Sequence, residues 1–287
     1  MIRLGIVLAG VLGSKIGFAE LCQWAKANRY DAIDVPASRE DGFEIARRAG
    51  LEVAATGGVP QLIVADDAER ERNVEAALAR LEVVARAGGK LVQLGHARAA
   101  DVADDAEQVR FAQLGYGPVA AQAERLGIRL VIENWHGNGR NFMLSPRNWR
   151  AVLEAVPSTA LGLCFDPSHL VVLGIDWLRA LREFGSRVYY AHAKDTEVNP
   201  EGIYQDGYAT PFFGRMGAQP GRGWWRYTLP GFGVVDTGRY LGALREVGFD
   251  GVISVEHEDD VWGWRSDVPR ALEGLKAAER CLRPYLG

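Results

Sequence analysis

The segment Leu130-Val131-Ile132-Glu133-Asn134-Trp135 passes from three apolar residues to a carboxylate in a single step. The same step occurs where three other apolar runs reach Asp166, His192 and Glu256. A buried strand admits a charge only where it leaves the core or meets a partner, because stripping water from an unpaired charge costs several kcal/mol. Four such exits on one rim can share one cation, so the pattern predicts a metal site.

Short apolar runs alternate with longer amphipathic segments along the chain, and we count eight strand–helix pairs. The expected strands are 4–8, 32–35, 51–55, 91–94, 130–133, 161–165, 188–192 and 252–256. The clearest helix patterns are 16–28, 67–87, 106–126, 146–155 and 237–247. Helical patterns stop at Gly50, Gly88, Gly127 and Gly248, as left-handed helix ends require.

Strict alternation of strand and helix implies parallel strands joined by right-handed crossovers. Eight units favour a closed (β/α)8 TIM barrel, an α/β fold, over an open doubly wound sheet. The nucleotide-binding patterns GxGxxG and GxxxxGK[ST] are missing. The 287 residues are close to the roughly 250 of one barrel, so we predict a single domain over 1–287. In such barrels reactive groups lie at the carboxyl ends of the strands, where the four candidate ligands fall.

The charge balance and the cysteines exclude some classes of function. A formal net charge of -4 disfavours a nucleic-acid partner. Cys22, Cys164 and Cys281 show no CxxC spacing, so we expect neither a disulfide framework nor a thiolate zinc site, and a cytoplasmic location is the expectation. No basic leader opens the sequence, and no apolar run approaches the roughly 20 residues that cross a bilayer, so no membrane partner is expected.

The connection at about 196–236, after the seventh strand, lacks clear periodicity and is dense in glycine, proline and aromatic residues. Its aromatic residues include Tyr204, Tyr208, Phe212, Phe213, Trp224, Trp225 and Tyr227. Loops this long inside compact domains are usually functional, and this one is too aromatic for disorder. We predict a folded cap over the barrel mouth; the alternative is a subunit-contact arm, which would make the protein a homo-oligomer.

Three carboxylates and one imidazole form a hard donor set suited to Mn²⁺, Mg²⁺ or Co²⁺. Each residue alone has a simpler explanation: Asp166 as a cap for the turn at Pro167, Glu133 as a partner of Arg140. All five histidines closely follow predicted strands. Of these, His169 is the best candidate for holding a substrate oxygen, whereas His96 or His257 could be hydrogen-bonded core groups.

Four motifs carry a resemblance to a known family. They are Glu133-Asn134-Trp135, Asp166-Pro167-Ser168-His169, His192-Ala193-Lys194-Asp195 and Val255-Glu256-His257-Glu258-Asp259. In this order they resemble the sugar phosphate isomerase/epimerase group of xylose-isomerase-like TIM barrels. The segments Gly231-Phe232-Gly233-Val234-Val235-Asp236 and Gly248-Phe249-Asp250-Gly251 resemble that group too, so the likeness spans most of the chain.

The resemblance implies a metal-dependent isomerase or epimerase that acts on a keto sugar through a metal-bound enediolate. One divalent ion, Mn²⁺ as the first expectation and Mg²⁺, Co²⁺ or Zn²⁺ as alternatives, would be held by the four strand-end residues. In the ketose 3-epimerase branch two glutamates move the proton, which here would be Glu133 and Glu256. For contact with the carbohydrate we assign His169, Lys194, Trp135 and His96.

The sequence departs from the ketose 3-epimerases at one position. They carry an arginine about six residues beyond the ligand histidine, where this chain has Val198. Lys194 would replace that arginine; the alternative is that it only pairs with Asp195 or Glu258. Strict 3-epimerase activity is therefore only one option.

Relatives that use the same α-proton abstraction give the main alternative function. These are inosose dehydratases and enzymes that cleave C-glycosides of 3-keto sugars, so a metal-dependent lyase is the second expectation. Less favoured alternatives are an endonuclease IV-like barrel and a non-catalytic carbohydrate-binding barrel.

Overall fold

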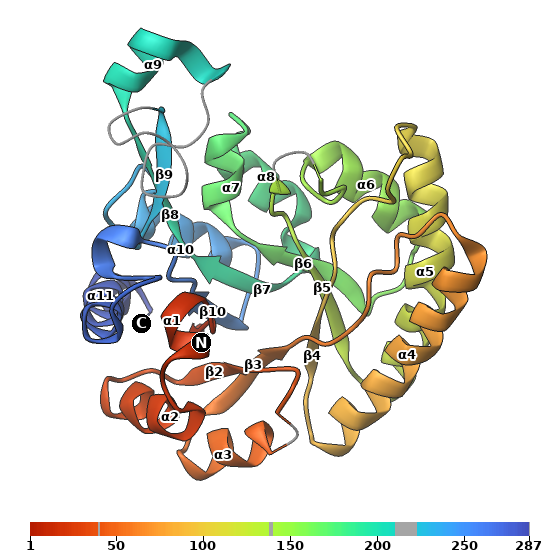
Figure 1. Ribbon diagram of the computed structural model, residues 1–287, viewed down its shortest axis with the longest axis horizontal. Coiled ribbons are helices and arrows are strands. Elements are labelled where there is room, and N and C mark those ends of the chain that lie inside the picture. Colours follow the sequence, from red (N-terminus) through yellow and green to blue (C-terminus); the bar gives the residue numbers. More distant parts are fainter. Residues whose placement is uncertain (40, 138–139, 210–222, 287) are drawn as a thin grey trace.

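A computed structural model describes residues 1–39, 41–137, 140–209 and 223–286. Eight parallel strands form one sheet in the order β1-β10-β7-β6-β5-β4-β3-β2, flanked by helices (Figure 1). The barrel strands are β1 (Arg3–Ile6), β2 (Ala32–Val35), β3 (Glu52–Thr56), β4 (Leu91–Leu94), β5 (Arg129–Glu133), β6 (Leu161–Phe165), β7 (Val188–Ala193) and β10 (Val252–Val255). This is the predicted TIM barrel.

The sheet comes together at the seam between β1 and β2, where Asp31 links the two strands. The backbone N–H of Asp31 donates to the carbonyl of Leu4 at 2.8 Å. In return, the backbone N–H of Leu4 donates to the Asp31 carboxylate at 3.0 Å. A side chain thus takes the place of one ladder bond, and the barrel is nearly closed.

The helices lie outside the ring of strands (Figure 1). They are α1 (Gly10–Ser14), α2 (Phe18–Ala27), α3 (Gly42–Arg48), α4 (Asp67–Arg86), α5 (Asp105–Leu126), α6 (Pro146–Ala155), α7 (Pro167–Val172), α8 (Trp177–Phe184), α9 (Pro200–Asp206), α10 (Thr237–Glu246) and α11 (Val268–Leu282). Aspartate side chains accept N-terminal backbone N–H groups of several helices, as Asp66 does for α4 and Asp104 for α5. None of the described helices is both long and apolar enough to span a membrane.

The predicted element boundaries agree with the structure to within two residues. The four predicted helix-stop glycines have left-handed backbone with φ of 77°, 79°, 63° and 80°, in the order Gly50, Gly88, Gly127 and Gly248. The predicted helix ranges do not include α11, which has 15 residues, or the short helices α3, α7 and α8. The short ones have one or two turns each, too few to show a helical repeat.

Two apolar clusters fill the two layers of the fold. The large cluster joins strand and helix residues, whereas a small one comes from strands alone and packs inside the barrel. Its buried members are Ala32, Ala54, Ala55, Val131, Cys164, Tyr190 and Val252. Side chains two positions apart on a strand lie on the same face of the sheet. A residue that follows one of these cluster members by two positions therefore also points into the barrel.

The long connection after β7 contains an antiparallel hairpin of β8 (Asp195–Val198) and β9 (Trp225–Thr228). It stands beside α7 and carries α9 at its outer end (Figure 1). Trp224, Trp225 and Tyr227 pack together with Val172 of α7. This confirms ordered structure at both ends of the connection; Phe212 and Phe213 lie outside the described residues.

Candidate metal centre

The four predicted ligands lie together at the carboxyl end of the barrel. Glu133 ends β5, Asp166 follows β6, His192 belongs to β7 and Glu256 follows β10. One potential ligand atom of each lies within 4.8 Å of those of the other three. Glu256 is partly exposed and the other three are buried.

Strand alternation explains why these side chains meet. Val131, Cys164 and Tyr190 belong to the interior cluster. The residue two positions later on each chain segment faces the same way, which brings Glu133, Asp166 and His192 to the barrel axis. The apolar layer is thus the floor of the site.

His192 presents its Nδ1 atom to the carboxylates. This nitrogen lies 3.2 Å from Glu133 Oε1, 3.2 Å from Glu256 Oε2 and 3.7 Å from Asp166 Oδ2. Three oxygens and one nitrogen therefore face a common point.

Asp166 has two different carboxylate oxygens. Its Oδ1 accepts the backbone N–H of Ser168 at 2.8 Å and caps α7, so the capping explanation holds alongside the cluster. Its Oδ2 is buried and accepts no hydrogen bond within the described chain, although Lys194 Nζ lies 3.2 Å away. Asn134 fixes the backbone here, because its amide both donates to and accepts from the main chain of Asp166 at 2.8 Å.

The other simple explanation, a pair of Glu133 with Arg140, is not what the structure shows. Arg140 Nε donates to the carbonyl of Gly137 at 3.3 Å. Glu133 Oε1 instead lies 3.2 Å from His169 Nε2 and 3.2 Å from His192 Nδ1. Glu133 is therefore committed to the cluster.

The electrostatics of the cluster call for positive charge. Burial would raise the pKa of Glu133, but His192 and His169 hold it well below its usual range. Burial opposes protonation of His192, yet Cys164, Glu256 and Glu133 raise its pKa well above the usual value. Without a metal the imidazole keeps a proton, and a bound cation would take its place.

The residues present fit a divalent ion. A buried carboxylate oxygen without a hydrogen bond is costly unless a ligand completes it, and Asp166 Oδ2 is such an atom. Carboxylate oxygens with one imidazole suit Mn²⁺, Mg²⁺, Co²⁺ or Zn²⁺.

Lys194 lies inside the same cluster. Its ammonium group hydrogen-bonds to Glu256 and, at 3.0 Å, to Glu258 Oε2. Burial would lower the pKa of Lys194, but Asp166, Glu256 and Glu258 raise it well above the usual value. The predicted ion pair of Lys194 with Glu258 is thus present. Lys194 also contacts two candidate metal ligands, Asp166 and Glu256, which an ion pair with Glu258 by itself does not explain.

Asp195, the other proposed partner of Lys194, is used elsewhere. Its carboxylate accepts backbone N–H groups of Gly231, Gly233 and Val235 at 3.2, 3.0 and 2.9 Å. The Gly-rich segment before α10 is therefore pinned by an internal carboxylate.

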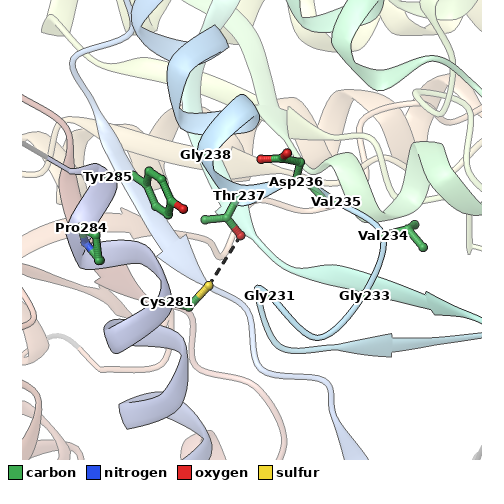
Figure 2. A pocket seen from close by; sticks show the side chains of 10 residues that line it. All are labelled: Gly231, Gly233, Val234, Val235, Asp236, Thr237, Gly238, Cys281, Pro284 and Tyr285. Carbon is green, nitrogen blue, oxygen red and sulfur yellow. Dashed lines mark hydrogen bonds between the residues drawn. The ribbon is translucent and has the colours of Figure 1, made fainter.

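The outer side of that segment borders a cavity of about 600 Å³, next to Cys281 and Tyr285 (Figure 2). Thr237 Oγ1 lies 3.6 Å from Cys281 Sγ across it. None of the described residues that line this cavity belongs to the metal cluster. We therefore do not assign the active site to this cavity, although it is large.

Among the predicted substrate contacts, His169 is in the cluster. It is fully buried, with Nε2 3.2 Å from both Glu133 Oε1 and Lys194 Nζ. Its Nδ1 lies 2.6 Å from the hydroxyl of Tyr227. His169 thus links the candidate metal centre to the β8–β9 hairpin.

His96 and Trp135 form a separate wall at the end of β4 and β5. Their rings meet edge to face with centroids 5.4 Å apart. Both are partly exposed, and burial lowers the pKa of His96. Their role in holding substrate stays a prediction.

Tyr227 and His136 are site residues that the sequence analysis did not single out. The Tyr227 hydroxyl lies 2.9 Å from His136 Nε2, and Lys194 Nζ lies 4.5 Å from the centre of its ring. The aromatic density of the connection was the available signal, but nothing in it distinguishes Tyr227 from its neighbours. The contact puts the hairpin against the mouth; the cap and the subunit-contact arm both stay predictions.

The comparisons with known proteins agree with the barrel fold. The model of the family described as xylose isomerase-like TIM barrel matches residues 14–282. A crystal structure of an IolI protein with a bound zinc atom superposes with a TM-score of 0.77 at 17% identity, covering 100% of both chains.

Two curated relatives show sequence similarity. An inosose isomerase of Bacillus velezensis is 30% identical over 105 residues, 37% of this chain and 31% of the relative. An inosose dehydratase of Clostridium perfringens is 26% identical over 147 residues, 51% of this chain and 46% of the relative. The chain spans less than half the length of these relatives.

Proposed function

The chain belongs to the xylose isomerase-like TIM barrel family, and on that premise we propose that it is a divalent-metal-dependent isomerase or epimerase of a keto sugar. One observation carries the proposal: four potential ligand atoms lie within 4.8 Å of one another at the barrel mouth. Proton-handling groups stand directly beside them: His169 Nε2 lies 3.2 Å from Glu133 Oε1, and Lys194 Nζ lies 3.2 Å from Asp166 Oδ2.

Glu133, Asp166, His192 and Glu256 would hold the ion, which we propose to be Mn²⁺, with Zn²⁺ as the alternative that the bound zinc of the IolI structure suggests. When bound, a divalent ion polarises a carbonyl and stabilises the negative charge that develops on its oxygen, an effect of several kcal/mol.

Glu133 and Glu256 are the proposed acid–base pair. Both carboxylates face His192 Nδ1 at 3.2 Å, so both border the place where a substrate must approach the ion. Their side chains are 9% and 13% exposed, which leaves them accessible to a small molecule in an otherwise buried site. One would remove the proton next to the carbonyl and the other would return it.

Lys194 and His169 would orient the substrate. The ammonium of Lys194 is held by Glu256 and Glu258, and His169 is held by Tyr227, so each donor has a fixed direction. Such pre-oriented groups bind hydroxyl and carbonyl oxygens without reorganising. Lys194 thereby takes the task for which the ketose 3-epimerases use an arginine.

Isotope exchange tests this function. When neutral ketoses are incubated with the Mn²⁺-loaded protein in D₂O, we expect the sugars to incorporate deuterium at a carbon next to the carbonyl. Glu256→Gln should reduce exchange by at least about 100-fold, because a general base supplies roughly 10²–10⁴-fold. Glu246→Gln, on the exposed surface of α10, is the matched control. Absence of exchange across the ketoses would reject the isomerase and epimerase assignment.

A lyase reaction is the second candidate, supported by the ammonium group inside the cluster. Lys194 lies against Glu256, so an ammonium group that can hydrogen-bond to a departing hydroxyl stands beside a carboxylate that can remove a proton. The similarity to an inosose dehydratase supports the same alternative. Appearance of ultraviolet absorption from an enone product with inososes, without exchange into recovered ketoses, would favour the lyase.

A further inference from the structure

A second cavity lies in the half of the barrel mouth that the metal cluster leaves unused. It measures about 250 Å³ and opens at the carboxyl ends of β1 to β4, between Leu8, Asp34, Ala37, Thr56 and Gln93. This is below the roughly 300–1,000 Å³ of sites for drug-sized ligands. The space suits a few carbon atoms of a small polar molecule.

Gln93 joins this cavity to the candidate metal centre. Its side chain lines the cavity, and its Nε2 atom lies 3.5 Å from Glu133 Oε2. A molecule held at the cluster and longer than the carbonyl group and its neighbour would therefore have room to extend past Gln93 into this space.

Asp34 is the charged group of the cavity. It lies two residues beyond Ala32 of the interior cluster, so strand alternation turns it inward like the metal ligands. It is 9% exposed, and the hydroxyl of Tyr190 donates to its Oδ1 atom at 2.6 Å. Tyr190 in turn contacts the ring of His192, with centroids 5.2 Å apart.

None of the described residues that line the cavity is a lysine, arginine or histidine. Arg80 borders it from outside, and its guanidinium donates to the carbonyl of Gly57 at 3.0 Å and to the hydroxyl of Thr56 at 3.1 Å. Burial raises the pKa of Asp34 to about 7, as expected for a carboxylate without an ion pair. Thr56 offers little to a ligand, because its hydroxyl donates to the carbonyl of Val35 and accepts from Arg80.

We propose that this cavity binds the end of the substrate remote from the metal, and that Asp34 selects an uncharged, hydroxylated end over a phosphorylated or carboxylated one. A hydroxyl group donates a hydrogen bond to a carboxylate, whereas a phosphate meets it with like charge, and the bordering cation Arg80 is already hydrogen-bonded to Gly57 and Thr56. The inference rests on the proposed function for the other end of the molecule. It narrows the substrate class to unphosphorylated keto sugars.

Calorimetric binding of neutral ketohexoses and their 6-phosphates to the Mn²⁺-loaded protein at pH 8 tests the selection. Each pair has the same carbonyl end and differs only at the remote end. We expect the neutral sugars to bind at least about 10-fold more tightly, since hydrogen bonds to charged groups have about that effect. Equal or tighter binding of the 6-phosphates, or no binding of any neutral ketohexose, would overturn the proposal.

Variants at two positions locate the effect. Asp34→Asn keeps the size of the side chain and removes its charge, so the preference for neutral sugars should shrink by about 10-fold while the affinity for Mn²⁺ changes by less than about 2-fold. Ala37→Lys, at an exposed position on the rim, should strengthen 6-phosphate binding without a core substitution. Asp41→Asn, an exposed carboxylate beyond β2, is the matched control.

The outcomes separate this proposal from the proposed function. If Asp34→Asn folds normally and keeps the full preference, or Ala37→Lys leaves 6-phosphate affinity unchanged, the role of the cavity is rejected even where deuterium exchange proceeds. If the preference depends on Asp34 but no ketose exchanges deuterium, the binding site stands and the isomerase chemistry falls.

Discussion

Replacing Lys194 with methionine tests whether its ammonium group is a built-in counter-ion of the candidate metal centre. The side chain is 1% exposed and lies 3.2 Å from Asp166 Oδ2, one of the proposed ligand atoms. It also pairs with Glu256, a second ligand. Methionine has a similar length and no charge, so the substitution changes the electrostatics with little loss of volume.

The magnitude follows from these distances. A divalent ion about 2.1 Å from Asp166 Oδ2 can be no more than about 5 Å from the ammonium. At an effective dielectric constant of about 20, the repulsion between the two cations would be at least about 6 kcal/mol. Glu258, 3.0 Å from Nζ, offsets much of it. We expect a net gain of about 1–3 kcal/mol, or roughly 5- to 150-fold tighter Mn²⁺ binding.

The metal-free protein should respond in the opposite direction. Removing the ammonium leaves buried carboxylates without compensation, which typically costs about 3–5 kcal/mol. The midpoint of thermal unfolding should therefore fall in the presence of a chelator and recover when Mn²⁺ is added.

Titration calorimetry with Mn²⁺ and thermal unfolding with and without a chelator measure both effects. Lys90→Met, at an exposed position, is the matched control and should change neither. Weaker Mn²⁺ binding by Lys194→Met, or an unchanged stability of its metal-free form, would show that the ammonium group does not neutralise this cluster.

Three other predictions concern groups around the site. Tyr227→Phe removes the hydroxyl that hydrogen-bonds to His136 and His169. In urea denaturation this substitution should lower the free energy of unfolding by about 1–3 kcal/mol. Trp225→Phe is a comparison variant in the same hairpin. Mn²⁺ affinity should rise by up to about tenfold per pH unit between pH 6 and 8, because His192, whose pKa is raised, must lose its proton to bind the ion; a flat calorimetric profile would contradict this. Burial raises the pKa of Asp34 from 3.8 to about 7, so the folded protein binds this proton more tightly than the unfolded chain. The stabilisation from this proton is full below about pH 4 and is lost toward pH 7. In urea denaturation, the free energy of unfolding of the metal-free wild type relative to Asp34→Asn should therefore fall by up to about 4 kcal/mol over that range. An unchanged difference between the two proteins would refute this.

The candidate ligands could be predicted because local sequence carries the relevant physics. Each of Glu133, Asp166 and Glu256 interrupts an apolar run at the point where its strand leaves the core. In a parallel barrel all such points share one rim, so the fold class alone brings them together. The expected metal-dependent reaction came from the resemblance of the motifs. The structure added that His192 Nδ1 lies 3.2 Å from both Glu133 Oε1 and Glu256 Oε2.

Other site contacts could not be predicted in this way. Tyr227 reaches the site from a hairpin strand that lies 94 positions along the chain from Glu133 but contacts its partner His169 at 2.6 Å. Lys194 and Asp195 are adjacent in sequence and both charged, yet one enters the metal cluster and the other binds the backbone before α10. Alternation of side chains along the backbone separates them, and only the paths of the neighbouring segments determine what each one meets.

Local sequence was enough to predict the eight-fold alternation of strands and helices, the glycine helix ends and the rim on which the charged strand ends meet. These depend on short-range patterns of burial and backbone conformation, which neighbouring residues largely dictate. Only the folded chain shows that Lys194 shares the carboxylates with the expected metal, that Tyr227 contacts His169, and that the described residues lining the cavity beside Asp34 include no lysine, arginine or histidine. Such contacts join segments that no periodicity relates, because hydrogen bonds and Coulomb forces depend on distance in space and not on separation along the chain.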